Sequence, residues 1–520
     1  MQQYPLLVRH VAERAESIFP EREVVSRTQD GVERSTYRQV VERARRIASS
    51  LERLGVRPGD RVATFGWNSM RHLELYLAVP SLGAVLHTLN IRLFEDDLRY
   101  IVGHAEDRVI FLDATLAGVM PSFDGVEHEV LMPDGAGERE GALDYEQLVA
   151  DGDPGFAFPD LDEDTAAAMC YTSGTTGRPK GVVYSHRSTI LHSLGAAHPD
   201  AMGIRQADRV MPVVPMFHAN AWGIPYTATM SGAALVFPGP RMAPEEIAEL
   251  IARERVTLSA GVPTIWQCIL ELEEPPDISS LREVLSGGSA VPEAMIRAYD
   301  ERFGVPILQG WGMTETSPLA STSRVPAEQE LSTDERYEVR ACQGRVLPLV
   351  DFRIDAEAGG ELQVRGPWIA GTYYNDPSAG EKFTEDGWLR TGDVAELRHG
   401  SHIKLVDRTK DLVKSGGEWI SSVELENEIM AHPDVVEAAV IAIPHEEWME
   451  RPCACVVRRE GSALDADGVL EHLRPRVAKW WLPDRVEFID EVPKTSVGKF
   501  DKKLLRTRFA AAAPDQAARM

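Results

Sequence analysis

The sequence predicts an α/β protein made of a large N-terminal domain and a small C-terminal domain. Two observations carry this prediction. The chain has 520 residues, which is too long for one hydrophobic core. Its apolar residues recur at helical spacing and at strand spacing in alternate segments. Alternating helices and strands are typical of a largely parallel sheet that is covered by helices.

Two helices are expected near the N-terminus. Apolar residues recur at helical spacing over residues 8–18 and again over 37–54. The second helix should begin after Ser35-Thr36, whose side chains can cap its N-terminus, and should end at Gly55. The elements expected further along are strands at 61–65, 210–215, 233–238 and 258–262 and a helix at 244–255.

The pattern changes after about residue 340. Residues 361–365 alternate by twos, and Gly, Asp and Pro interrupt the segment through Asp393. This composition predicts antiparallel strands in a small, barrel-like part that completes the large domain.

A shorter unit follows this part. Ser421 and Glu424 fit a capping box that opens a helix ending before Pro433, and a strand should follow at 435–444. No flexible Gly/Ser linker separates the units, which hints at a defined hinge. We expect residues 1–407 to form the large domain of mixed parallel sheets, and residues 408–520 to form a small, mobile α+β domain.

Charge and composition exclude several classes of function. The formal net charge is −26, which argues against nucleic acid or an anionic membrane surface as a partner. Residues 1–10 lack the apolar core of a signal peptide, and no stretch approaches the ~20 apolar residues of a membrane span. A cytoplasmic protein is expected. The cysteines are scattered and odd in number, so reduced thiols are favoured over a metal site at Cys453 and Cys455.

Residues 171–186, YTSGTTGRPKGVVYSH, follow an apolar run and are rich in Gly, Ser and Thr. A Walker loop requires Gly, four residues and then Gly-Lys-Ser/Thr, but Pro179 stands where the second Gly should follow Gly174. Glycines that permit close backbone approach, hydroxyl donors and a lysine still favour a phosphate-binding loop over a solvated turn. The residues concerned are Thr172, Ser173, Gly174, Thr175, Thr176, Gly177 and Lys180.

Residues 171–181 resemble the signature loop of the adenylate-forming superfamily, which comprises acyl-CoA synthetases, adenylation domains of peptide synthetases and beetle luciferases. Trp311 stands where many members carry Tyr, and either ring can stack on adenine. Four more segments resemble family motifs, in order: an adenine-and-magnesium motif at 310–316, a ribose motif at 388–393, a hinge and first C-terminal loop at 407–417, and a terminal catalytic motif at 493–499. Residues 215–222 and 414–427 most resemble medium- to long-chain fatty acyl-CoA synthetases.

The resemblance implies an ATP-dependent ligase. A carboxylic acid would attack the α-phosphate of ATP to form acyl-AMP and pyrophosphate, and the thiol of coenzyme A would then displace AMP. Both steps need charge stabilisation more than side-chain proton transfer. The resemblance also implies a homodimer, and a C-terminal domain that rotates about Lys410 between the two steps. An aryl or short thioether acid, another acceptor, and a catalytically silent nucleotide-binding protein are the alternatives.

The resemblance assigns catalytic roles to Lys499, Glu315 and His218. Lys499 would reach the α-phosphate and the acyl oxygen, and Thr172 with Glu315 would hold Mg²⁺, which prefers hard oxygen ligands. His218 would lie beside the acyl carboxylate, and a structural histidine is its alternative.

Binding roles follow in the same way. Asp393 would bind the ribose hydroxyls with help from Arg408, and Trp222 would be an aromatic gate or a core residue. The other nucleotide-binding positions implied, besides the loop 172–180, are Ala219, Gly288, Gln309, Gly310, Trp311, Thr314, Lys410, Lys414 and Trp419. Those implied for coenzyme A are Gly416, Gly417 and Trp448.

Overall fold

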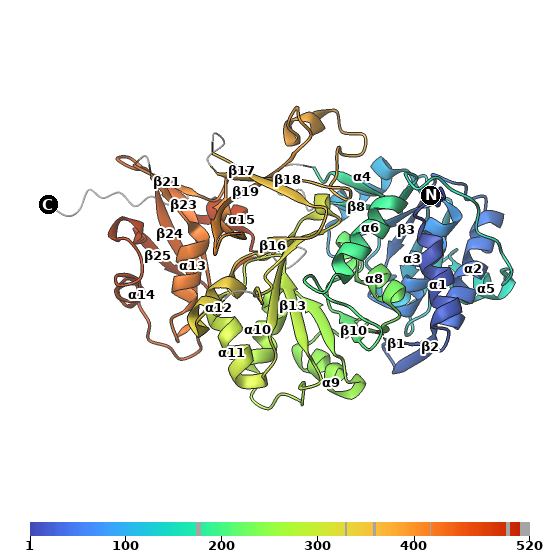
Figure 1. Cartoon of the computed structure of the whole chain (residues 1–520), viewed down its shortest axis with the longest axis horizontal. Helices are drawn as coiled ribbons and strands as arrows, with labels where there is room; N and C mark the ends of the chain where they lie inside the picture. The colour runs from blue at the N-terminus through green and yellow to red at the C-terminus, as the bar shows by residue number, and fades with distance from the viewer. Residues whose placement is uncertain (173–177, 328–329, 357–359, 417, 496–499, 510–520) are drawn as a thin grey trace.

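The computed structural model describes residues 1–172, 178–327, 330–356, 360–416, 418–495 and 500–509. The N-terminal elements lie at one end of an elongated molecule and the C-terminal elements at the other, with the middle of the chain between them (Figure 1). The strands within these residues form four sheets. The chain therefore has the α/β architecture with a smaller C-terminal α+β unit that the sequence predicts.

A seven-stranded sheet lies at the N-terminal end, in the order β7-β6-β5-β3-β4-β8-β9. Its neighbouring strands are parallel except for the last pair, β8 and β9. The segment that joins these two strands is the predicted phosphate loop. The strands are β3 (Arg61–Phe65), β4 (Val85–Thr88), β5 (Asp107–Asp113), β6 (His128–Met132), β7 (Leu143–Asp144), β8 (Ala166–Tyr171) and β9 (Gly181–Ser185), and the helices are α2 (Tyr37–Arg53), α3 (Met70–Leu82), α4 (Glu95–Ala105) and α5 (Tyr145–Asp151).

A nine-stranded sheet follows, in the order β16-β15-β14-β13-β12-β10-β11-β1-β2. The strands from β14 to β1 are parallel, so their carboxyl ends share one edge. The strands are β1 (Glu23–Arg27), β2 (Val32–Thr36), β10 (Arg209–Pro212), β11 (Ala234–Phe237), β12 (Leu258–Gly261), β13 (Glu283–Gly287), β14 (Ile307–Gly312), β15 (Leu319–Thr322) and β16 (Arg345–Val346). The helices are α1 (Val8–Ile18), α6 (His186–Ala197), α7 (Ala219–Trp222), α8 (Ile224–Ser231), α9 (Pro244–Glu254), α10 (Pro263–Glu271), α11 (Glu293–Phe303) and α12 (Thr333–Ala341).

Two smaller sheets complete the chain. The expected barrel-like part is a four-stranded antiparallel sheet, and the sheet after it mixes antiparallel strands with one parallel pair. The first holds β17 (Asp351–Asp355), β18 (Glu361–Arg365), β19 (Leu389–Arg398) and β20 (His402–Arg408). The second holds β21 (Val413–Ser415), β22 (Glu418–Ile420), β23 (Val435–His445), β24 (Met449–Arg458) and β25 (Arg485–Phe488), with α13 (Ser422–Met430), α14 (Ala466–Leu473) and α15 (Lys502–Phe509).

Local sequence signals explain many of these boundaries. The Thr36 side chain accepts a hydrogen bond from the Gln39 N–H and completes the capping box that opens α2. The strand expected at 210–215 differs most, because it ends three residues earlier than predicted. β10 ends at Pro212 because the N–H groups of Val213 and Val214 both donate to the Ala260 carbonyl, which ends the regular ladder.

The largest hydrophobic cluster joins the two large sheets, with Tyr37, Tyr76 and Trp368 among its buried side chains. The cysteines are free thiols, and Cys453 and Cys455 are buried on β24. No helix in the described ranges is both long and apolar enough to cross a membrane.

Candidate active site

Strands β8 and β9 bring Thr172 and Lys180 together. The Thr172 N–H donates to the Lys180 carbonyl at 2.9 Å, and the Lys180 N–H donates to Thr172 Oγ1 at 3.2 Å. The expected loop residues between them, Ser173 to Gly177, lie outside the described residues. The two ends of the predicted phosphate loop are thus held side by side, as a loop that encloses an anion requires.

Contacts of several aromatic residues hold the two ends of this loop in place. The Tyr171 hydroxyl is hydrogen-bonded to His104 Nδ1 at 2.7 Å, and the Tyr374 N–H donates to the Gly181 carbonyl at 2.8 Å. A Cβ atom on Gly181 would lie 3.2 Å from that of Tyr374, so a larger residue would crowd this contact. Also on the exit side, the Arg178 guanidinium lies 5.0 Å from the centre of the Tyr100 ring.

Glu315 lies in a short 3-10 turn, Thr314–Thr316, directly after β14. Its carboxylate accepts a hydrogen bond from the Tyr373 hydroxyl, and its main-chain carbonyl accepts one from the Ala370 N–H at 2.8 Å. Burial and the negative charge of Glu315 raise the pKa of Tyr373, so this hydroxyl remains a donor. A carboxylate has about four lone-pair sites. Glu315 and the Thr172 hydroxyl are hard oxygen donors, which fit a magnesium ion that keeps waters and substrate phosphates as further ligands.

Trp311 and Asp393 come together although they are far apart in the sequence. The buried Trp311 indole N–H donates to Asp393 Oδ2 at 2.9 Å, and Arg408 Nε lies 3.2 Å from Asp393 Oδ1. Asp393 on β19 is the direct register partner of Arg408 on β20. The predicted adenine and ribose residues therefore form one continuous cluster.

Glycines allow strands β13 and β14 to carry this cluster. A Cβ atom on Gly287 would lie 2.5 Å from the Gly310 carbonyl oxygen, which rules out any side chain there. Gly288 has φ +88°, a conformation that glycine adopts without strain. The expected residue Gln309 is buried, and its side-chain amide donates to the carbonyls of Ala341 and Cys342. Its Oε1 also accepts from the Val291 N–H at 2.7 Å. The side chain of Gln309 is thus engaged in holding these loops.

Residues 219–222, which follow His218, form a left-handed turn. Ala219, Asn220, Ala221 and Trp222 have φ between 44° and 58°. Such a conformation costs roughly 1–2 kcal/mol per residue without glycine and is typical of functional sites. Asn220 Oδ1 stabilises the turn by accepting hydrogen bonds from Cys170 and the Tyr76 hydroxyl. The turn places the half-buried Trp222 ring 3.4 Å from where a Gly287 Cβ would stand, beside Gly288.

The expected coenzyme A residues lie on the C-terminal sheet. The Gly416 N–H donates to the Trp448 carbonyl at 2.9 Å, and a Cβ atom on Gly416 would lie 2.7 Å from the Trp448 ring. Nearby, the Lys414 ammonium lies 5.0 Å from the centre of the exposed Trp419 ring. Gly417 and Lys499 lie outside the described residues. Trp448 is 44% exposed, so this sheet presents aromatic surface beside a glycine backbone.

Lys410 lies in the segment 409–412 that joins β20 to β21, and burial lowers its pKa. The neighbouring Thr409 N–H donates to the Gly392 carbonyl at 3.0 Å, one residue before Asp393. The expected pivot is therefore tied to the expected ribose site.

Tyr373 and Asp376 are two site residues that the sequence reasoning missed. Tyr373 contacts Glu315, as described above, and Asp376 Oδ2 lies 2.9 Å from Lys180 Nζ. Both lie in Gly371-Thr-Tyr-Tyr-Asn-Asp376, a polar stretch between strands. A run of polar and aromatic residues in such a connection was the available signal.

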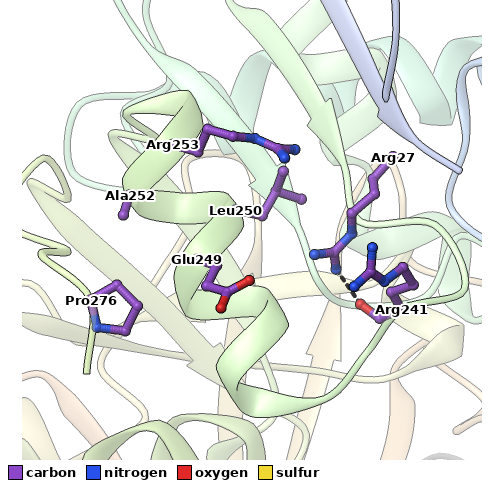
Figure 2. Close-up of a pocket in the computed structure, with 7 residues that line it drawn as sticks. All are labelled: Arg27, Arg241, Glu249, Leu250, Ala252, Arg253 and Pro276. Carbon is purple, nitrogen blue, oxygen red and sulfur yellow. Dashed lines mark hydrogen bonds between the residues drawn. The ribbon is translucent and has the colours of Figure 1, made fainter. Parts of the chain in front are cut away.

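A separate hollow of about 320 Å³ lies between the end of β1 and α9 (Figure 2). Arg27 donates hydrogen bonds there to the carbonyls of Pro238, Arg241 and Glu246, and burial lowers its pKa to about 10. The negative charges of Glu246 and, more weakly, of Glu249 on α9 act against this lowering. Arg27 thus has a structural role: it joins the loop after β11 to α9. The lining residues, none of which is an expected site residue, are Arg27, Arg241, Glu249, Leu250, Ala252, Arg253 and Pro276.

Comparison with known proteins agrees with this geometry. The family described as AMP-binding enzyme matches residues 12–374, and the AMP-binding enzyme C-terminal domain matches residues 424–499. The long-chain-fatty-acid–CoA ligase of Thermus thermophilus is 46% identical, over 96% of this chain and 94% of that protein. The 3-methylmercaptopropionyl-CoA ligase of Ruegeria pomeroyi is 44% identical, over 98% of each chain.

A solved structure agrees as well. The ATP-bound MatB of Rhodopseudomonas palustris superposes with a TM-score of 0.84 at 29% identity, and the match covers 97% of this chain and 99% of that chain. The chain therefore belongs to the AMP-binding enzyme family of the adenylate-forming superfamily, and it is an AMP-forming acid–CoA ligase.

Proposed function

We propose that this ligase activates a medium- to long-chain fatty acid and transfers it to coenzyme A. The observation that carries the proposal is the convergence of Trp311, Asp393 and Arg408 with the Glu315 turn and the ends of the 172–180 loop. The segments 215–222 and 414–427 support a fatty acid as substrate through their resemblance to fatty acyl-CoA synthetases.

The proposed roles follow from this geometry. Asp393, held by Trp311 and Arg408, would accept hydrogen bonds from the ribose hydroxyls, and Lys180 would face the β- and γ-phosphates. Thr172 and Glu315 would hold Mg²⁺, which supplies charge neutralisation on the phosphate oxygens.

In the first step the fatty acid carboxylate attacks the α-phosphate, the bond to pyrophosphate breaks, and acyl-AMP forms. Lys499 would stabilise the charge that develops there. His218, which directly precedes the left-handed turn, and Trp222, at the end of the turn, would position the carboxylate and close the acyl site. In the second step the coenzyme A thiol attacks the acyl carbon, AMP leaves, and Gly416, Gly417 and Trp448 would line the path of the thiol. We propose a boundary at 407/408 and a homodimer in the cytoplasm as the setting.

A short thioether acid is the second candidate substrate, because the relative that is 44% identical is named as a 3-methylmercaptopropionyl-CoA ligase. The test is AMP release with acids from propionate to palmitate, together with 3-(methylthio)propionate, with and without coenzyme A. We expect the highest kcat/KM between octanoate and palmitate, and full turnover only with coenzyme A. If kcat/KM is highest with 3-(methylthio)propionate, the second candidate replaces the fatty acid as substrate. If AMP is released at the same rate with and without coenzyme A, coenzyme A is not the acyl acceptor.

A further inference from the structure

Residues 368–376, which we name the strap, contact both halves of the phosphate site. The Ala370 N–H donates to the Glu315 carbonyl at 2.8 Å, and the Tyr374 N–H donates to the Gly181 carbonyl at 2.8 Å. The Trp368 carbonyl accepts a hydrogen bond from Ser317 Oγ at 2.6 Å. The strap therefore holds the exit of the phosphate loop and the Glu315 turn at a fixed spacing.

Side chains of the strap join the two halves electrostatically. Lys180 Nζ lies 2.9 Å from Asp376 Oδ2 and 4.9 Å from the centre of the Tyr373 ring, and the Tyr373 hydroxyl donates to Glu315. The side chains of Lys180 and Asp376 are 34% and 18% exposed. Partial burial strengthens the attraction within this ion pair relative to an exposed pair.

A phosphate that binds at Lys180 must share the ammonium group with Asp376 or displace it. The Asp376 carboxylate also repels a polyphosphate that approaches the same ammonium. We propose that Asp376 is a counter-ion that competes with phosphate for Lys180. Its carboxylate weakens the binding of ATP and pyrophosphate, and it re-forms the ion pair with Lys180 when pyrophosphate leaves. This inference rests on the proposed role of Lys180 and adds a residue that sets affinity through it.

Weaker ground-state binding does not slow an enzyme whose turnover depends on product release. Binding the substrate and the transition state equally tightly lowers KM without raising kcat, and a tightly held pyrophosphate would delay the second half-reaction. A carboxylate that competes for the lysine reduces the excess ground-state binding of ATP and shortens the time for which pyrophosphate stays bound.

The test is calorimetric titration of the full chain with Mg·ATP and, separately, with pyrophosphate, in the absence of acid and coenzyme A. Asp376→Asn keeps the size of the side chain and removes its charge, and we expect both ligands to bind about fivefold more tightly, as the loss of a competing ion pair predicts. Turnover with acid and coenzyme A should show a lower KM for ATP together with a lower kcat. A merely structural role would weaken binding instead.

Two comparisons make the result specific. Glu385→Gln removes the same charge from an exposed residue in the same connection between β18 and β19, and it should leave both affinities unchanged. In a Lys180→Met background, Asp376→Asn should tighten binding much less than it does in the wild type, because the ion pair with the lysine is already lost and only the direct repulsion of phosphate remains.

Unchanged or weaker binding in Asp376→Asn, or equal tightening in Glu385→Gln, would overturn the inference. If Asp376→Asn fails to fold by circular dichroism, Asp376→Ala must show the same tightening. A wild-type chain that does not bind Mg·ATP would instead overturn the proposed function, so the two failures are distinguishable.

Discussion

Asp393 shows how single residues acquire a role in this site. Its carboxylate is buried, and it is oriented by the Trp311 indole from β14 and by Arg408 from the adjacent strand β20. A ligand that needs two hydrogen-bond acceptors would find them already oriented, which reduces the ordering cost of binding. Trp311 therefore has a second role besides any stacking on adenine.

Replacing Trp311 tests this second role. Trp311→Phe keeps an aromatic face but removes the N–H donor to Asp393, and the loss of a hydrogen bond to a charged group costs about 1.5–3 kcal/mol. We expect KM for ATP to rise at least tenfold, with a smaller change in kcat, in steady-state kinetics. If Trp311 acted only by stacking, Trp311→Phe would bind ATP almost as well as the wild type.

The sequence motifs predicted which residues would be found together, but not what holds them. The structure brings Thr172 together with Lys180, and Trp311 together with Asp393, while their roles toward a ligand stay predictions. Tyr373 and Asp376 were missed because their contacts depend on how a long connection folds back over β9 and the Glu315 turn. The hydrogen bonds of the Gln309 side-chain amide could not be predicted from the sequence either, because its partners Val291, Ala341 and Cys342 come from distant loops.

At the scale of elements, α15 connects the C-terminal sheet to the hinge segment. Its apolar residues Leu505 and Phe509 pack in a cluster with residues of β23 and β24. On its other side, Lys502 Nζ lies 2.6 Å from Glu426 Oε1, and Arg506 is paired with Asp411. Burial raises the pKa of Glu426 to about 7, so its charge depends on the nearby lysine.

Removing Lys502 should destabilise this unit. Lys502→Met leaves a buried carboxyl without its cation, which costs about 3–5 kcal/mol. The folded-state pKa of Glu426 lies above that of the unfolded chain, so the folded protein holds the proton between roughly pH 4.5 and 7, and stability falls as pH rises across that window. Urea unfolding should show a larger loss near pH 8 than near pH 5.

Two controls accompany this prediction. The exposed neighbour change Lys503→Met should alter the free energy of unfolding by no more than about 0.5 kcal/mol. The double variant Lys502→Met/Glu426→Leu should be more stable than Lys502→Met, because the buried Glu426 carboxyl is removed. Recovery should be incomplete, because the buried Asp407 also loses the charge of Lys502. A double variant that is less stable than Lys502→Met would contradict the pairing.

Elements with strong local signals were predictable and those set by tertiary contacts were not. The capping residue Thr36 and the apolar period of residues 37–51 fix α2 almost to the residue. The left-handed turn at Ala219–Trp222 has no such signal, because alanine and tryptophan disfavour this conformation and only contacts such as those of Asn220 impose it. Predicting it would require the packing around Cys170 and Tyr76.

At the scale of the whole molecule, contacts on both sides of the hinge fix the orientation of the C-terminal unit in this structure. Asp407 Oδ2 accepts a hydrogen bond from the Ser422 N–H at 2.6 Å, and Arg459 Nη1 lies 3.7 Å from Glu271 Oε1 on α10. Lys499 and Gly417 both belong to this unit, and the proposed mechanism needs them in different steps. The proposed rotation would break at least some of these contacts.

Proline at the proposed pivot tests the rotation. Lys410→Pro fixes φ near −65° at this position and should hold the unit in one orientation. We expect the variant to fold and to form acyl-AMP if the first orientation is retained, while thioester formation from acyl-AMP and coenzyme A falls about tenfold or more. Lys410→Ala should lose much less of that second rate. Thioester formation at the wild-type rate in Lys410→Pro would exclude a hinge at this residue.

The short connection at 409–412 has a consequence for how molecules in solution interact. At about 3.5 Å per residue this connection spans roughly 14 Å when fully stretched. The C-terminal unit can therefore rotate, but it cannot move far from the large domain of its own chain. A short tether keeps a group at an effective concentration in the millimolar range, far above that of any other chain. Under the proposed mechanism, each copy would therefore supply Lys499 to its own large domain, and two copies with complementary defects would not restore one another.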